Sequence, residues 1–277
     1  MSDICTTTGR IYSATSTQPG HKQHEGPASE KDCFPERTHE VRPVKPGYSQ
    51  NVISHVESTG EGMSWSVSYN AALQTVRLVT SRNPVHDTPQ AWIQQWLEDM
   101  MATDSLALSD RAHLKLDVGT TFTKFSGKYA ASYKKSDFCI TPVWMDFPTV
   151  VIENGWSESR DQLHDDRDMW LKGGHGLTQI VIVLKWSEND DKEVHGDVEI
   201  FELDRNGVVR STQKETVFPA PACPEVAASQ YLTITKGQLW GPVATTQEKD
   251  QSLKLNIDYL RAITTRKIEA YGLTPAK

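Results

Sequence analysis

One stretch of the chain, LTQIVIVLKW at residues 177–186, is apolar at consecutive positions instead of at every second one. Such a run is typical of a strand that is buried on both faces of a sheet. This segment therefore predicts a sheet that other elements cover on both sides.

Three segments have the spacing of amphipathic helices. The first is expected at residues 89–103, where Pro89 suits the first turn and apolar residues recur at i, i+3 and i+4. The second follows Ser157 or Ser159 as its N-cap and ends at the glycine pair 173–174. The third is expected at 251–272, with its inward positions at Leu253, Ile257, Leu260 and Ile268.

The other ordered segments read as strands, because apolar and polar residues alternate in them or turn residues bound them. They are residues 62–70, 74–82, 113–125, 134–156, 197–218 and 231–241, of which 113–125 is either one strand or a strand pair broken at Gly119. The segment 134–156 reads as a hairpin with strands at about 135–141 and 149–155. The segment 197–218 reads as a hairpin around Arg-Asn-Gly. The order of elements predicts one α/β domain with a mixed sheet at 49–277, with a core at about 89–205 and a C-terminal hairpin and helix at 206–272.

Residues 1–48 are rich in Ser, Thr, Pro, Gly, Lys and Glu and hold few apolar side chains. We expect this tail to be disordered, because it cannot bury enough apolar surface to offset the entropy of ordering. It has no apolar segment typical of a secretory signal, and no apolar run approaches the about 20 residues that span a bilayer. None of the four cysteines stands in a CxxC pair. We expect a soluble intracellular protein with free thiols, in the cytoplasm or nucleus.

The net charge of -7 and pI near 5.7 lack the overall basic character of a typical DNA-binding domain, although local basic patches remain compatible with them. The third expected helix carries four basic residues, Lys254, Arg261, Arg266 and Lys267. They indicate either a helix face exposed to solvent or a face that contacts phosphates. The pair His164 and Asp168, at i and i+4, is a weaker candidate for a metal site.

A carboxylate interrupts an otherwise apolar strand in PTVVIENGWSES, residues 148–159. Glu153 is costly to bury without a partner. In a symmetric hairpin Asp137 would lie opposite it, with Cβ atoms about 5 Å apart. Two carboxylates that close favour a shared cation, and Mg²⁺ or Mn²⁺ prefers oxygen ligands. The alternative is a structural ion pair of Glu153 with Lys134, Lys135 or Arg160.

The segments KKSDF, FPTVVIENGWSES, QLHDDRDMWLKGG and LTQIVIVLKW, in this order, resemble the PD-(D/E)XK restriction-endonuclease-like superfamily. The resemblance covers about residues 90–205 and is nearest to a group of uncharacterised fungal members. The matching positions are Lys134 or Lys135, Asp137, Pro148, Glu153, Gly155, Ser157, Glu158, Ser159, Leu163, Asp166, Trp170 and Leu171. The family implies a core of helix, three-stranded meander, helix and strand.

The resemblance also implies roles for individual residues. Asp137 and Glu153 would bind a divalent ion, with Glu98 or Asp99 of the first helix completing the set. The lysine of the E-x-K motif falls at position 155, which is glycine here. The following helix offers Arg160, Arg167 and Lys172 in its place, and we expect Arg167 to take the catalytic role. Arginine is not equivalent to lysine, since it is always protonated and planar.

Two functional hypotheses follow from the resemblance. The first is a Mg²⁺- or Mn²⁺-dependent nuclease-like enzyme that acts on a phosphodiester of DNA or RNA through Asp137, Glu153 and Arg167. The second is a catalytically inactive relative that serves as a binding or interaction module. A basic side chain close to the two carboxylates, from Arg160, Arg167, Lys172 or Lys185, would favour the first, and an empty space at Gly155 would favour the second. A third reading makes Glu153 a purely structural charge.

Overall fold

The computed structural model describes residues 37–277 with the exception of 50, 52–64, 81–82 and 246–247. Most of the tail expected to be disordered therefore lies outside the described residues. The expectation was wrong for residues 38–41, which form strand β1 (Thr38–Val41). The side chain of Val44 is buried, and its carbonyl oxygen accepts a hydrogen bond from the Tyr69 hydroxyl at 2.9 Å. Tertiary contacts thus order a segment whose composition alone would not fold.

The main sheet has seven strands and is mixed, as the sequence predicts. Along the sheet the order is β11-β10-β9-β8-β7-β4, and β14 pairs with β10. The β8–β9 and β10–β14 pairs are parallel, and the other pairs are antiparallel. The strands are β4 (Leu114–Val118), β7 (Phe138–Pro142), β8 (Val150–Gly155), β9 (Ile180–Glu188), β10 (Glu193–Leu203), β11 (Val209–Phe218) and β14 (Thr274–Pro275).

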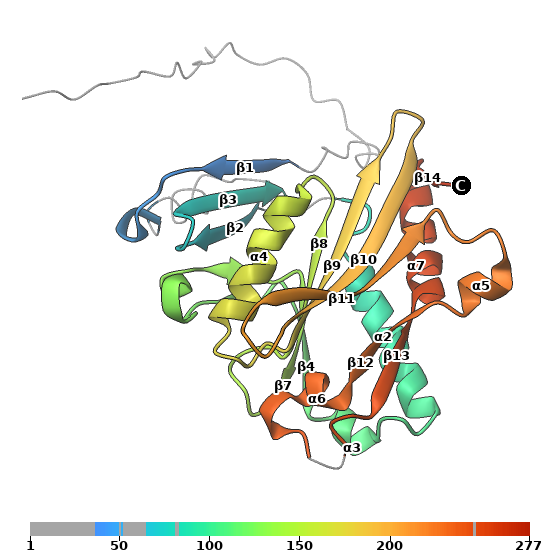
Figure 1. The fold of residues 1–277 in the computed structure, drawn as a ribbon. Helices are drawn as coiled ribbons and strands as arrows, with labels where there is room; N and C mark the ends of the chain where they lie inside the picture. Colours follow the sequence, from blue (N-terminus) through green and yellow to red (C-terminus); the bar gives the residue numbers. More distant parts are fainter. Residues whose placement is uncertain (1–36, 50, 52–64, 81–82, 246–247) are drawn as a thin grey trace, which may run out of the picture. The chain divides into compact units, whose positions relative to one another are not determined.

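Helices cover both faces of this sheet, which is why β9 can be apolar at consecutive positions (Figure 1). Helix α4 (Arg160–Gly173) lies over one face, where Trp170 packs in a core with Val151, Val181 and Val183. Helices α2 (Thr88–Ala102) and α7 (Ile257–Ala270) lie over the other face. The residues of β9 from Ile180 to Leu184 are fully buried.

Helix α4 begins where the sequence predicts. The Ser159 hydroxyl accepts a hydrogen bond from the backbone N–H of Gln162, and the Gln162 side chain accepts one from the backbone N–H of Ser159. This reciprocal capping box satisfies two backbone donors that the first helical turn would leave unpaired. Gly174 is the C-cap residue. The helix therefore has a fixed start directly after β8, and this start sets the position of its acidic side chains.

A smaller sheet stands beside the core, with strand order β1-β3-β2. Strand β2 (Trp65–Asn70) and strand β3 (Thr75–Thr80), which alternation in the sequence predicts as strands, form an antiparallel pair. Tyr69 of β2 pairs with Tyr133, just before β6 (Lys134–Lys135), which itself pairs with β5 (Thr121–Phe122). These contacts bring β2 and β3 to the chain segment that leads into β7.

The C-terminal region differs from the prediction in two places. The strand expected at 231–241 stops after β12 (Tyr231–Thr235), where Thr235 and Gln238 form a second capping box and start helix α6 (Lys236–Trp240). The helix expected from residue 251 begins only at Ile257. The preceding residues form β13 (Ser252–Asn256), so Leu253 is inward-facing in a strand instead of a helix. Pairing of β12 with β13 overrides the helical spacing.

The remaining described elements are short: α3 (Leu108–Arg111), η1 (Gly127–Tyr129), α5 (Pro224–Ala228) and η2 (Gly241–Val243). The turn of the β10–β11 hairpin contains Gly207 at a φ of 73°, in agreement with the predicted positive-φ turn. In the described part of the chain, no helix combines the length and the apolar character needed to span a bilayer.

Candidate functional site

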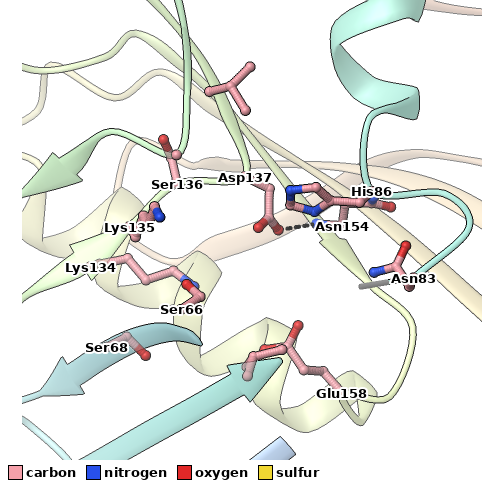
Figure 2. Close-up of a pocket in the computed structure, with 13 residues that line it drawn as sticks. Ser66, Ser68, Asn83, His86, Lys134, Lys135, Ser136, Asp137, Asn154 and Glu158 are labelled. Atoms are coloured by element: carbon pink, nitrogen blue, oxygen red, sulfur yellow. Dashed lines mark hydrogen bonds between the residues drawn. The ribbon is translucent and has the colours of Figure 1, made fainter. Parts of the chain in front are cut away.

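A polar pocket of about 290 Å³ lies where the smaller sheet meets the edge of the main sheet. Strands β2 and β3 form one wall, and the segment from β6 into β7 forms another (Figure 2). The end of β8 and the residues before α2 and α4 complete it. The lining residues are Ser66, Ser68, Val79, Asn83, His86, Val118, Gly119, Lys134, Lys135, Ser136, Asp137, Asn154 and Glu158. Segments far apart in the sequence therefore share one cavity.

The β7–β8 pairing places the two predicted carboxylates as the sequence suggests. Phe138 pairs with Ile152 and Cys139 with Val151. Extending this register by one residue sets Asp137 opposite Glu153. The Oδ2 atom of Asp137 accepts a hydrogen bond from the backbone N–H of Asn154 at 2.8 Å (Figure 2). This bond fixes the Asp137 side chain at the wall of the pocket.

Glu153 is only 1% exposed, and each of its carboxylate oxygens has a donor. The Trp170 indole N–H donates to Oε1 at 2.6 Å, and the Lys134 ammonium lies 2.9 Å from Oε2. Of the three structural partners considered from the sequence, Lys134 is the one found in contact. The buried carboxylate in the apolar strand is therefore neutralised from within the chain.

Lys134 and Arg77 hold three buried carboxylates together. The Lys134 ammonium donates to Oδ2 of Asp166 at 2.6 Å, and Nη1 of Arg77 donates to the same oxygen at 2.7 Å. Arg77 also lies 3.6 Å from Glu158. All five side chains are at least nine-tenths buried. We call Arg77, Lys134, Glu153, Glu158 and Asp166 the buried charge cluster. It joins β3, β6, β8 and α4.

Burial and charge act in opposite directions on these groups. Burial raises the pKa of Glu153 to about 8 and that of Glu158 to about 7, although Lys134 lowers both. Burial would also raise the pKa of Asp166, but the charges of Arg77 and Lys134 outweigh it and lower the pKa. Burial would lower the pKa of Lys134, but Asp166 and Glu153 raise it above its usual range. Lys134 is therefore charged, and Asp166 is its main counter-ion.

The other predicted site residues lie elsewhere. Glu98 is on the exposed side of α2. The Arg167 guanidinium donates to Oδ1 of Asp168 at 2.7 and 2.9 Å and lies 4.5 Å from the centroid of the Phe201 ring. These contacts hold Arg167 away from the pocket walls, which it does not line. The structure thus does not bring Glu98 or Arg167 to Asp137 and Glu153.

Two further basic side chains of this region are also engaged elsewhere. Arg160 pairs with Asp197 and Glu199, and Lys172 pairs with Asp168. The basic group near the predicted carboxylates is instead Lys134, which precedes Asp137 by three residues. From the sequence, Lys134 was expected only as a structural partner of Glu153 or as a position of the family pattern.

The packing of Leu163 against Gly155 explains why glycine stands at the E-x-K lysine position here. A Cβ atom at this residue would lie 2.7 Å from Cδ1 and 3.1 Å from Cγ of Leu163. Leu163 is fully buried in the core under α4. The space that a lysine would need is therefore filled by helix packing, and it is not an empty gap.

The Gly155→Lys variant is expected to lose about 1–3 kcal/mol of unfolding free energy, because Leu163 has no room to move in a close-packed core. Urea denaturation measures this loss. Gly47→Lys is the matched control, since nothing lies within 4 Å of a Cβ there. Equal midpoints for the two variants would contradict the role assigned to Leu163.

The carboxylate oxygens at the predicted metal position already have donors from this chain. Both oxygens of Glu153 already accept from Trp170 and Lys134, and Oδ2 of Asp137 accepts from Asn154. Across the described residues, no group of three or more His, Cys, Asp or Glu side chains is arranged to hold a metal. The ammonium of Lys134 lies between Glu153 and Asp166, and it supplies a positive charge to Glu153.

Sequence reasoning missed Arg77 and the walls that β2, Asn83 and His86 contribute to the pocket. The signal for Arg77 was slight: it is the one charged residue within TVRLVT. No comparable signal marks Asn83 or His86, since only the fold brings their loop to the end of β8.

Comparison with known proteins found no relative for this chain: no family model, no curated protein and no solved structure matches it.

Proposed function

We propose that this protein is a non-catalytic binding protein built on a restriction-endonuclease-like core, and that the polar pocket is its binding site. The observation that carries the proposal is the position of Lys134. Its ammonium lies 2.9 Å from Glu153 and 2.6 Å from Asp166, where a metal-dependent enzyme would need free carboxylate oxygens. Displacing a buried lysine from two carboxylates would leave charges unpaired.

The order of elements supports the core assignment. Helix α2 is followed by the antiparallel strands β4, β7 and β8, then by α4, and then by β9, which is parallel to β8. This is the sequence of elements that the resemblance implies for the superfamily. The motif residues have structural tasks in this arrangement. Trp170 donates a hydrogen bond to Glu153, and Asp166 forms an ion pair with Lys134. Ser159 caps α4, and the missing side chain of Gly155 leaves room for Leu163.

The pocket is a poor match for a phosphodiester backbone. Its walls carry Asp137 and Glu158, and Glu153 and Asp166 lie behind Lys134. Binding of nucleic acid relies on basic side chains that neutralise phosphates. Here Lys134 and Arg77 are already matched with carboxylates. Of the cations that the described residues bring to the pocket, Lys135 alone has no carboxylate partner, which favours a ligand with little negative charge.

One observation favours the second candidate, a metal-dependent nuclease. Asp137 and Lys134 line the same pocket, so an aspartate and a lysine do meet at the edge of the sheet. In such an enzyme Lys134 would stabilise negative charge on a scissile phosphate. It would have to do so while it is bonded to two buried carboxylates.

A combined metal-binding and nuclease experiment tests the proposal. Titration of the wild-type chain with Mn²⁺ in a calorimeter is expected to give no binding heat, and incubation of plasmid and single-stranded DNA with Mg²⁺ or Mn²⁺ is expected to give no cleavage. Asp137→Ala and Glu153→Ala serve as references. Saturable Mn²⁺ binding and DNA cleavage that both disappear in the two variants would instead establish the nuclease.

A further inference from the structure

A second cavity opens on the main sheet beside its edge strand β4. This cavity, the β4 groove, has a volume of about 710 Å³, and its lining residues include Lys115, Asp117, Lys124, Asp146 and His175. Small-molecule sites have volumes of about 300–1,000 Å³, so the groove is large enough for an organic ligand. The β4 groove and the polar pocket share no lining residue. A ligand in this groove therefore adds a function beyond the proposed one.

Four charged side chains surround the β4 groove. Asp117 lies opposite Cys139, whose side chain packs in the core under α4. Lys115 has the same orientation as Asp117, because alternate residues of a strand point to one face of the sheet. Lys124 and Asp146 are exposed loop residues that line the same groove. The salt bridges between described residues involve none of these four side chains.

The balance of charges determines which ligands fit the β4 groove. An anionic ligand would meet Asp117 and Asp146, and a cationic ligand would meet Lys115 and Lys124. A neutral ligand with many hydroxyl groups can use all four side chains, because a hydroxyl group both donates and accepts hydrogen bonds. Hydrogen bonds to ionised groups are also stronger than those between neutral groups. The groove therefore favours a sugar over a phosphate or an amine.

An exposed tryptophan extends the β4 groove. Trp144 is 52% exposed, although its ring contacts two other rings. The indole of Trp240 is nearly parallel to it, at 16° and with 6.0 Å between the ring centroids, and the centroid of the His113 ring lies 5.1 Å from that of Trp144. These contacts hold Trp144 in place while much of its surface stays open. A tryptophan fixed in this way offers a large apolar surface to a ligand.

Trp144 is joined to the groove through Lys115. The Lys115 ammonium donates a hydrogen bond to the carbonyl oxygen of Met145 at 3.3 Å, directly after Trp144 in the chain. The groove residue Asp146 follows in the same turn. His113, which contacts Trp144, precedes Lys115 by two residues. The apolar ring and the charged groups are therefore available to one extended ligand.

Two residues that line the groove have a costly backbone conformation. The φ angle of Lys124 is 64° and that of His175 is 57°, in the left-handed region that favours glycine. Atom Nε2 of His175 donates a hydrogen bond to the carbonyl oxygen of Lys124 at 2.6 Å, so each residue holds the other. Such strain persists only where the surrounding structure fixes it, and it is frequent at binding sites. This wall of the groove therefore has a fixed shape.

We infer that the β4 groove and Trp144 bind a neutral oligosaccharide of β-linked, glucose-type hexoses. In these sugars the ring substituents are equatorial, so the two faces of the ring carry only C–H groups and are apolar. Such a face is complementary to the indole of Trp144. Hydroxyl groups of the same ring or of the next one accept hydrogen bonds from Lys115 and donate them to Asp146 and Asp117.

A peptide is less suited to this groove than a sugar. A peptide that adds a strand to a sheet pairs with backbone groups at the sheet edge. The β4 groove is instead built from side chains on the face of the sheet, such as those of Lys115 and Asp117, whose residues already pair with β7.

The test is an NMR titration of the isotope-labelled full chain with cellohexaose, laminarihexaose and chitohexaose. These hexasaccharides differ in linkage or in one ring substituent, and all have the equatorial ring. At least one of them is expected to give a saturable shift of the indole N–H resonance of Trp144, which is assigned by its loss in Trp144→Ala. The backbone resonances of Lys115 and Asp146 report binding in the variants.

The Trp144→Ala variant is expected to weaken binding of the hexasaccharide at least about tenfold, or about 1.4 kcal/mol. Tyr48→Ala is the matched control, because Tyr48 is 66% exposed and lines neither cavity, and it should bind as the wild type does. Asp146→Ala is a second variant that keeps the stacked rings intact. It should bind about fivefold more weakly, which is the effect of one lost hydrogen bond.

Two results would overturn the inference: no saturable shift with any of the three hexasaccharides, or unchanged affinity in both Trp144→Ala and Asp146→Ala. Oligothymidylate is the competing probe, since exposed tryptophans also stack on nucleobases. Tighter binding of this probe than of the sugars, lost as salt is added, would assign the surface to single-stranded nucleic acid instead. None of these results involves the polar pocket, so the Mn²⁺ and nuclease experiment tests the proposed function separately.

Discussion

Replacing Lys134 by methionine is expected to lower the free energy of unfolding by about 3–5 kcal/mol at pH 7.5. The ammonium of Lys134 is the partner that both Glu153 and Asp166 share, at 2.9 and 2.6 Å. Methionine fills a similar volume but leaves two buried carboxylates with one fewer cation. The midpoint of urea denaturation, followed by circular dichroism, measures the loss.

Lys135→Met is the matched control for this experiment. Lys135 is the adjacent residue in β6 and is half-buried, with no salt bridge to a described residue. Its replacement is expected to change stability by less than about 1 kcal/mol. The Lys134→Met defect should also shrink at pH 5, where the carboxyl groups can take up protons. A defect as small as that of Lys135→Met would mean that the cluster does not hold the fold together.

The second large effect is a fall in stability as the pH rises from about 5 to 8. The folded-state pKa of Glu153 is raised to about 8 and that of Glu158 to about 7, both above the ordinary value of 4.5. The folded chain therefore keeps protons in this window that the unfolded chain has released. For each proton that only the folded chain keeps, the free energy of unfolding falls by about 1.4 kcal/mol per unit rise in pH.

Two variants test this assignment. Glu153→Gln and Glu158→Gln should each flatten the curve of unfolding free energy against pH, because amides do not titrate. Glu98→Gln, at an exposed position, should leave the curve unchanged. Asp166 gives the opposite trend at acid pH, since its pKa is lowered and its contribution is lost as the pH falls. Curves of equal slope for the wild type and both glutamine variants would refute the assignment.

Much of the fold could be predicted from local patterns. The apolar run of β9, the cap at Ser159 and the Arg-Asn-Gly turn each depend on residues close together in the sequence, and the structure confirms all three. The symmetric hairpin also set Asp137 opposite Glu153. The predictions that were wrong concern segments whose secondary structure depends on pairing with distant strands. Strand β1 and strand β13 form because β3 and β12 offer them hydrogen-bonding partners.

The candidate site was predictable only in part. A carboxylate in an apolar strand indicates that it has a positively charged partner, and Lys134 was among the partners considered. Whether this partner is a lysine or a metal ion depends on which side chains reach the same oxygen. Arg77 and Asp166 are 89 residues apart, and their 2.7 Å hydrogen bond follows from the packing of β3 against α4.

By itself the sequence determined the mixed sheet, the burial of β9 on both faces and the need to neutralise Glu153. These follow from the periodicity of apolar residues and from the cost of burying one charge, which are both local properties. The tertiary structure alone decided that Lys134 supplies the neutralising charge, that Leu163 fills the space beside Gly155, and that Glu158 faces a pocket. The reason is physical: an ion pair or a cavity depends on positions in space that distant segments share, and no short window of sequence contains them.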